Sequence, residues 1–224
     1  MDIFEAITKR KSIRNYLLDP VSKDLLKKVL QIAVQAPSAM NTQPWEFTVV
    51  AGDVIENIRK ENIKKLRANI TPEPEFDYID WPSDSEYRNR QVALGRQLFK
   101  LMGIERGDKE KRTQWSERGF RFFDAPAAII ITADRLLTLM APPALDIGAV
   151  MQSICLAAMH LNLGTCIENQ SIMYPDVIRQ YADIPESRML ITSIAIGYPD
   201  DDFPANKVES EREPVDSVTT WCGL

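Results

Sequence analysis

The stretch Ala127-Ala128-Ile129-Ile130-Ile131-Thr132-Ala133 is a continuous apolar run of mostly small and β-branched residues, and it follows the pair Ala125-Pro126. A run without polar alternation is typical of a strand that other elements cover on both faces. A second near-continuous run extends from Met189 to Ile196 and closes at Gly197. Both runs predict β-strands, and the first predicts a buried one.

Shorter strand signals and helical patterns lie on either side of these runs. Phe47-Thr48-Val49-Val50, between a proline and a glycine, predicts a strand, and Thr165-Cys166-Ile167 predicts a short one. Residues 146–161 are apolar almost all round, which indicates a central buried helix. Residues 71–82 contain three prolines and several acids and predict a surface loop. Helical spacing of apolar residues predicts further helices over 2–9, 22–36 with Ser22 as the N-cap, 54–68, 83–102, 108–120 and 174–181.

The composition is that of an ordinary globular protein. Of the 224 residues, 45% are hydrophobic and 26% are charged, and such a chain buries roughly 70% of its unfolded surface. The formal net charge of −5 argues against nucleic-acid binding as the main purpose. We recognise no signal peptide, and the most apolar stretch, residues 147–163, falls short of a membrane span. Three cysteines without metal-like spacing suit a reducing cytosol, so we expect a cytoplasmic protein.

The chain changes character after Gly197. Residues 198–224 are rich in Asp, Glu and Pro and contain few apolar residues until Val218 and Trp221. This C-terminal arm has no core of its own, yet it contains a tryptophan whose ring favours burial, so it either frays or wraps over another surface. We see no domain boundary before the arm, and residues 1–224 are therefore predicted to form a single domain.

Several familiar cofactor and metal motifs are absent. The sequence contains neither Gly-x-Gly-x-x-Gly nor the phosphate-binding Gly-x-x-x-x-Gly-Lys-Ser/Thr. The only histidine, His160, lies in the apolar helix, as is typical of a core or interface histidine. One histidine and scattered cysteines do not build a common zinc site, and no metal is predicted. A bound redox cofactor is then a natural source of chemistry.

The first candidate site is the segment Arg10-Lys11-Ser12-Ile13-Arg14. Two arginines, a lysine and a hydroxyl supply forked donors, a point charge and one small donor, which are the groups that bind a phosphate dianion. Alternatively, cations near the end of a helix only complement its dipole. The segment alone leaves both interpretations open.

The second candidate site is Pro37-Ser38-Ala39-Met40-Asn41-Thr42-Gln43-Pro44-Trp45, between a helix and a strand. Its backbone amides, hydroxyls and carboxamides can hydrogen-bond a polyhydroxyl chain or the polar edge of a flavin. The alternative is an ordinary helix–strand connection in which Trp45 fills the core.

In this order, the two segments resemble the nitroreductase family of FMN enzymes. The likeness extends over nearly the whole chain. It includes Phe122-Phe123-Asp124-Ala125-Pro126 before the apolar strand, and Leu145-Asp146-Ile147-Gly148-Ala149-Val150-Met151-Gln152 at the start of the long helix. Leu163-Gly164-Thr165-Cys166, Ile194-Ala195-Ile196-Gly197-Tyr198-Pro199 and the closing Arg212-Glu213-Pro214 are similar to the family too.

The resemblance implies a fold and an activity. The fold is α+β, an α/β/α sandwich whose central mixed, mainly antiparallel sheet is flanked by helices, in an intertwined homodimer that exchanges its C-terminal arms. The activity is ping-pong hydride transfer from NADH or NADPH, through N5 of FMN, to a small oxidised substrate such as a nitroaromatic or a quinone. Reductive dehalogenation, dehydrogenation, or a flavin-binding or redox-sensing module without efficient turnover remain open.

The resemblance also implies which residues bind the flavin. Arg10, Lys11, Ser12 and Arg14 match the family's phosphate and ribityl segment, and Arg212 matches a phosphate contact from the arm. Ser210 stands where the family often has a further lysine. Pro37, Ser38, Ala39 and Asn41 match a loop that reaches the flavin of the other subunit. Glu168 and Asn169 lie where a backbone amide approaches flavin N5. No catalytic side chain is implied, since the chemistry takes place on the flavin.

The region from Asn69 to Gly119 departs most from short members of the family. Its aromatic residues either form a lid that selects aromatic substrates or pack this helical insertion onto the domain. They are Trp81, Tyr87, Phe99 and Trp115, with Phe120 directly after them.

Overall fold

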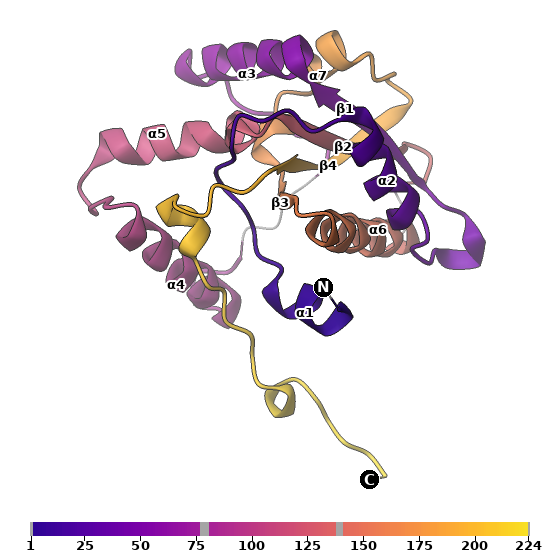
Figure 1. Ribbon diagram of the computed structural model, residues 1–224. Coiled ribbons are helices and arrows are strands. Elements are labelled where there is room, and N and C mark those ends of the chain that lie inside the picture. The colour runs from indigo at the N-terminus through magenta and orange to yellow at the C-terminus, as the bar shows by residue number, and fades with distance from the viewer. Residues whose placement is uncertain (1, 77–80, 138–140, 224) are drawn as a thin grey trace.

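The computed structural model describes residues 2–76, 81–137 and 141–223, and its centre is a four-stranded sheet (Figure 1). The strands are β1 (Trp45–Ala51), β2 (Ala127–Asp134), β3 (Gly164–Glu168) and β4 (Arg188–Gly197), in the order β1-β2-β4-β3. All four predicted strands are confirmed. The sheet is mainly antiparallel, as predicted, because the β1–β2, β2–β4 and β3–β4 ladders are all antiparallel. In the described part of the chain, parallel pairing is confined to an isolated bridge between Ser12 and Thr165.

Helices surround the sheet and follow the predicted ranges closely. Side-chain oxygens of Asp2, Ser22, Ser85 and Asp108 cap four of them by accepting a hydrogen bond from a first-turn backbone amide. The second helix ends at Ala33, earlier than Ala36 as predicted. The helices are α1 (Ile3–Lys9), α2 (Lys23–Ala33), α3 (Gly52–Arg67), α4 (Glu86–Leu101), α5 (Lys109–Phe120), α6 (Ala141–His160) and α7 (Pro175–Ala182).

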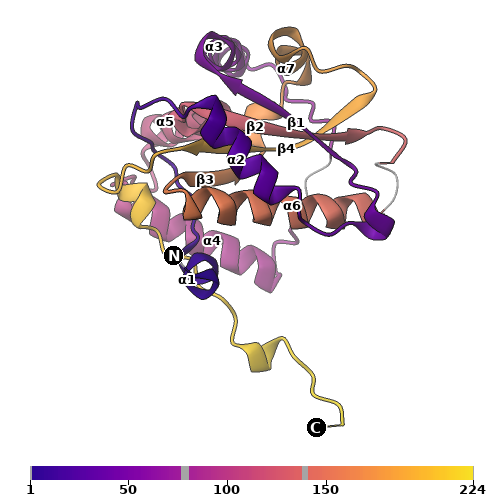
Figure 2. The same ribbon diagram turned by 45° about the vertical axis from the view of Figure 1, so that its right-hand side comes forward.

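The buried strand β2 divides the core into two layers. Its residues Ile129 and Ile131 pack in a cluster with residues of α2 and α6. The intervening Ile130 packs in a second cluster with residues of α3 and α7. Figures 1 and 2 show these helix pairs on opposite faces of the sheet. The predicted α/β/α sandwich is confirmed, and it explains why the sequence of β2 lacks polar alternation.

Helix α6 is less buried than the sequence predicted. Its inner face is buried through Ile147, Val150 and Ile154, but its other face is not covered within this chain. Leu145 is 75% exposed, and Gln152 and His160 are exposed as well. The helix is therefore not buried all round, and His160 is not a core histidine of the single chain.

The C-terminal arm begins docked and ends free of the body. Ala205, Asn206 and Val208 are buried, whereas the chain after them runs away from the sandwich (Figure 2). The apolar residues of this outer part find no cover in the single chain, since Val218 is 69% exposed and Trp221 is 60% exposed. None of the described helices has the length and apolar character that a membrane crossing requires.

The five aromatic residues within or directly after the helical insertion lie in three different environments. Trp115 packs against Phe123, and Phe120 is buried against Tyr174, so both rings pack α5 onto the domain. Phe99 lies under Arg112. Trp81 and Tyr87 form an exposed pair with ring centroids 5.1 Å apart, and for them the lid stays a prediction. The predicted loop 71–82 contains neither helix nor strand in residues 71–76 and 81–82, and residues 77–80 lie outside the described part.

Candidate functional site

A cavity of about 150 Å³ lies where the end of α1, the C-terminal half of α6 and the start of β3 meet. Cations of the first candidate segment line it on one side. Backbone and apolar groups of β3 and α6 line the other. The residues around it are Lys9, Arg10, Lys11, Ile13, Cys155, Met159, Leu163, Gly164, Thr165, Pro199 and Asp201.

The backbone beside this cavity is irregular but fully held. Ile13 N donates to Thr165 O at 2.9 Å, so the segment continues the edge of the sheet beside β3. Arg14 N donates to Asn206 Oδ1 at 2.6 Å. Gly164 permits the close approach, because a Cβ there would lie 2.6 Å from Cγ1 of Ile13. The segment is therefore preorganised by strand, arm and glycine before any ligand binds.

Two of the three cations that line the cavity have no ion-pair partner among the described residues. Lys9 pairs with Glu5 at 2.6 Å, but Arg10 and Lys11 form no hydrogen bond or ion pair through their side chains with any described residue. The carboxylate of Asp201 also lines the cavity and lies outside ion-pair distance of both. Fixed backbone with uncompensated guanidinium and ammonium groups is an arrangement that binds a phosphate-like anion.

The second candidate segment forms a polar loop at the other end of α6. Asp146 near the start of α6 accepts the backbone amide of Ala39 with both carboxylate oxygens, at 3.1 and 3.2 Å. Ser38 Oγ accepts Gln43 N at 3.0 Å. Met40, Asn41 and Gln43 have positive φ angles of 49°, 60° and 47°, so the loop is tightly wound and its exposed side chains, Asn41 among them, point outward.

One chain does not bring the two candidate segments together. Asp146 holds the loop, whereas Met159 lines the cavity beside Arg10. The helical rise between these two positions of α6 is about 20 Å. Arg212 is likewise separate, because among the described residues its guanidinium donates only to Ser210 and Glu211 within the arm.

Glu168 and Asn169 end β3 with their side chains engaged inside the protein. The Glu168 carboxyl accepts Ser193 Oγ at 2.8 Å and Ser171 N at 3.2 Å. Burial raises its pKa to about 7, and the hydrogen bonds from both serines only partly offset that effect. Asn169 Oδ1 accepts Thr192 Oγ1 at 2.6 Å. At the end of β3, the groups available to a ligand are therefore the backbone groups of Glu168 and Asn169.

Three residues that support the site were not among the sequence candidates. Asn206 and Arg118 hold the backbone of Arg14 from positions 192 and 104 residues away, and no local pattern reveals such contacts. Asp146 stands at the predicted start of the long helix, but 107 positions separate it from Ala39, so the sequence did not reveal this contact either.

Comparisons with known proteins agree with this geometry. The model of the Nitroreductase family matches residues 7–198. The nitrobenzene nitroreductase of Ectopseudomonas oleovorans is 33% identical over 98% of this chain and 96% of that protein. The chloronitrobenzene nitroreductase of Comamonas testosteroni is 31% identical over the same shares.

Solved structures are similar over their whole length. The FMN and NADPH-dependent nitroreductase NfnB from Sphigopyxis sp. strain HMH has a TM-score of 0.94 at 28% identity, with 100% of both chains covered. The FMN-dependent nitroreductase NfnB from Mycobacterium smegmatis, solved in complex with NADPH, has a TM-score of 0.90 at 25% identity, covering 98% of this chain and 97% of that one. This chain therefore belongs to the nitroreductase family.

Proposed function

We propose that the chain is an FMN-dependent oxidoreductase that passes electrons from NADPH or NADH to a nitroaromatic or a similar small oxidised substrate. The observation that carries the proposal is the preorganised segment 10–14, whose Arg10 and Lys11 line the cavity beside β3 with no ion-pair partner among the described residues. Ser12 and Arg14 of the segment do not line this cavity. The relatives whose names specify nitrobenzene and chloronitrobenzene support the substrate class. Two of the similar structures carry NADPH in their names, and this supports NADPH as the reductant.

The side chains of this site are of the types that bind the phosphate and ribityl groups of FMN. Arg10, Lys11, Ser12 and Arg14 would hold its phosphate and ribityl chain with charged and hydroxyl donors. The backbone at Glu168 and Asn169 would face the ring. When bound, the flavin supplies a two-electron carrier that accepts hydride from the nicotinamide and passes it on after the nicotinamide leaves. The protein need only bind, orient and exclude water, and no general base is required.

We infer that the site is completed by a second copy of the chain. The loop with Pro37, Ser38, Ala39 and Asn41 lies about 20 Å from the cavity along α6, so it would serve the flavin of the partner. A two-fold dimer provides that exchange, because each subunit then gives one segment and receives the other. Arg212 would reach its phosphate contact in the same assembly.

Uncovered apolar surfaces support this dimer. The outer face of α6, the 79% exposed Phe4 of α1, and Trp221 of the arm all lack cover in the single chain. An apolar groove beside the edge strand β1 offers a place for an arm from a second copy. It is lined by Val21, Leu26, Leu30, Val34, Val49 and Ala51, with the aliphatic stems of Lys23 and Lys27 and with Gln31. The three cysteines are free, which fits the proposed cytoplasmic location.

The spectrum of the purified protein and its redox cycling test the proposal. We expect a yellow dimer whose flavin absorbance bleaches on anaerobic mixing with NADPH or NADH and returns when nitrobenzene is added. Flavin that binds but does not bleach with either nucleotide would favour a binding or sensing module. Protein that takes up no flavin from an excess of FMN would refute the proposal.

A further inference from the structure

Arg118 of α5 is a largely buried arginine that does not line the cavity. Its side chain is 17% exposed, and Nε is buried with no hydrogen-bond partner in the described chain. Burial lowers the pKa of this guanidinium, while Asp124 opposes that shift and Arg121 adds to it. A charged group persists in such surroundings only where its remaining donors are well used.

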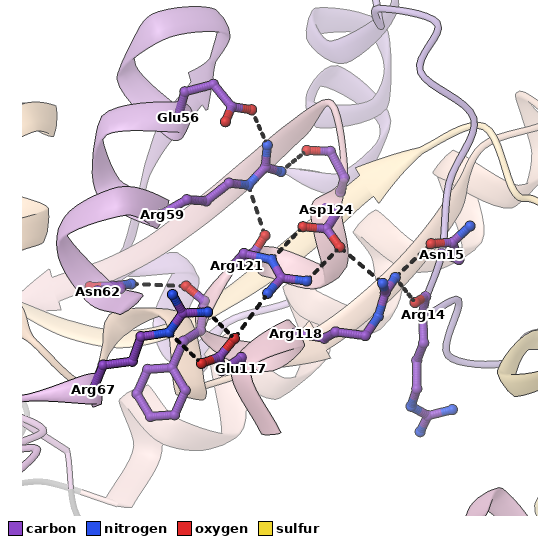
Figure 3. A network of polar contacts seen from close by, with 12 residues as sticks. Arg14, Asn15, Glu56, Arg59, Asn62, Arg67, Glu117, Arg118, Arg121 and Asp124 are labelled. Atoms are coloured by element: carbon purple, nitrogen blue, oxygen red, sulfur yellow. Dashed lines mark hydrogen bonds and ion pairs between the residues drawn. The ribbon is translucent and has the colours of Figure 1, made fainter. Parts of the chain in front are cut away.

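The remaining donors join segments that are distant in sequence (Figure 3). Nη2 donates to the backbone oxygen of Arg14 at 3.1 Å and to Asn15 Oδ1 at 2.5 Å. Nη1 lies 3.1 Å from Oδ2 of Asp124, in the turn that precedes β2. The Cζ atom lies 4.9 Å from the ring centroid of Phe203 at the base of the arm. One guanidinium thus connects the insertion, the cationic segment and the arm.

The contact with Arg14 has no substitute in the described chain. The amide of Arg14 is held by Asn206, but its carbonyl receives a hydrogen bond from Arg118 alone. This carbonyl lies three residues after Lys11, the last cation that lines the cavity. Loss of the Arg118 contact therefore frees one side of the backbone that directly follows those cations.

A comparison with the neighbouring Arg121 shows that the hydrogen bond to the Arg14 backbone belongs to Arg118. Arg121 belongs to the same network, where it pairs with Asp124 at 2.7 Å and with Glu117 at 3.7 Å. It makes no hydrogen bond to Arg14 or Asn15. Figure 3 shows Arg118 between Asp124 and the backbone of Arg14, with Arg121 on the far side of the carboxylate.

We propose that Arg118 is a positioning residue for the phosphate of the flavin: by fixing the backbone at Arg14 and Asn15, it holds the preceding Arg10 and Lys11 toward the cavity. The inference rests on the proposed function and adds to it a link between the helical insertion and cofactor binding. A lysine cannot replace Arg118, because a compact ammonium lacks the planar fork that reaches Arg14, Asn15 and Asp124 together.

The test compares the affinities of FMN and riboflavin, which differ by the phosphate alone. Dissociation constants are measured by fluorescence titration of flavin-stripped dimer for the wild type, Arg118→Lys and the matched control Arg121→Lys. We expect Arg118→Lys to weaken FMN binding about tenfold and riboflavin binding much less. Arg121→Lys disturbs the same network and should leave both affinities near the wild-type values.

Two results would overturn the inference: an equal loss of affinity for FMN and riboflavin in Arg118→Lys, or an equally large loss of FMN affinity in Arg121→Lys. If Arg118→Lys does not fold, Asn15→Ala takes its place, because it removes one of the acceptors of the Arg118 guanidinium. The inference then requires that Asn15→Ala weakens FMN binding more than riboflavin binding. Failure of the proposed function is a different result, since the wild type itself would then show no preference for FMN over riboflavin.

Discussion

At the scale of single residues, charge without a partner marks the site. Arg10 faces the cavity, and no described carboxylate lies within ion-pair distance of it. Arg10→Ala should remove a charge-assisted contact of roughly 1.5–3 kcal/mol, which weakens FMN binding about ten- to a hundredfold while the protein stays folded. Absorbance measures the flavin occupancy, and circular dichroism measures whether the protein is folded.

The control for this prediction is Arg96→Ala. The exposed Arg96 of α4 also has no hydrogen bond or ion pair with described residues, and this variant should bind FMN normally. Unchanged occupancy in Arg10→Ala contradicts the phosphate assignment.

The buried acid Glu168 predicts a dependence of stability on pH. Burial raises its pKa from 4.5 to about 7 in the folded chain. Between these values the folded state holds a proton that the unfolded state releases, so the contribution of Glu168 to stability is present at low pH and is lost as pH rises through 7. Glu168→Gln should therefore lose less stability than the wild type between pH 5 and 8, by on the order of 2–3 kcal/mol. Urea unfolding at the two pH values measures this difference, and parallel pH profiles of the two proteins would show the prediction to be wrong.

At the scale of elements, the arm carries apolar residues that are exposed in the single chain. Trp221 is 60% exposed in the single chain, and burial of such a ring in a partner makes it a candidate hot spot. Trp221→Ser should weaken the dimer by at least about 2 kcal/mol, or roughly thirtyfold in dissociation constant. Sedimentation over a range of concentrations measures the equilibrium. Ile70 is 47% exposed beside α7, on the face of the sheet opposite α6, and Ile70→Ser should leave association unchanged. A Trp221→Ser dimer as tight as the wild type would exclude the arm from the interface.

The elements themselves were predictable because their signals are local. Apolar periodicity and capping residues such as Ser22 identified the helices and strands within a few positions. The exposed face of α6 was not predictable, since an apolar stripe looks the same whether it meets the core or another subunit. The support of the site was not predictable either. Contacts such as that between Arg118 and Arg14 depend on the folded chain bringing together residues with no shared pattern.

At the scale of the whole molecule, the two candidate segments lie at opposite ends of α6. Asp146 fixes the polar loop, and the cavity with Arg10 lies about 20 Å away along the helix. A single FMN phosphate cannot touch both segments of one chain in this arrangement. A two-fold dimer can join the cationic segment of one subunit to the loop of the other, which makes every site a shared one.

Subunit complementation tests this sharing most directly. One chain carries Arg10→Ala, a second carries Ser38→Ala with Asn41→Ala, and the heterodimer is isolated through two different affinity tags. Shared sites predict that each homodimer binds FMN weakly, whereas the heterodimer regains about one site of wild-type affinity, because both lesions fall in its other site. Sites built within one chain leave a lesion in each half of the heterodimer. A heterodimer with no tight flavin site would therefore contradict a flavin held jointly by two subunits.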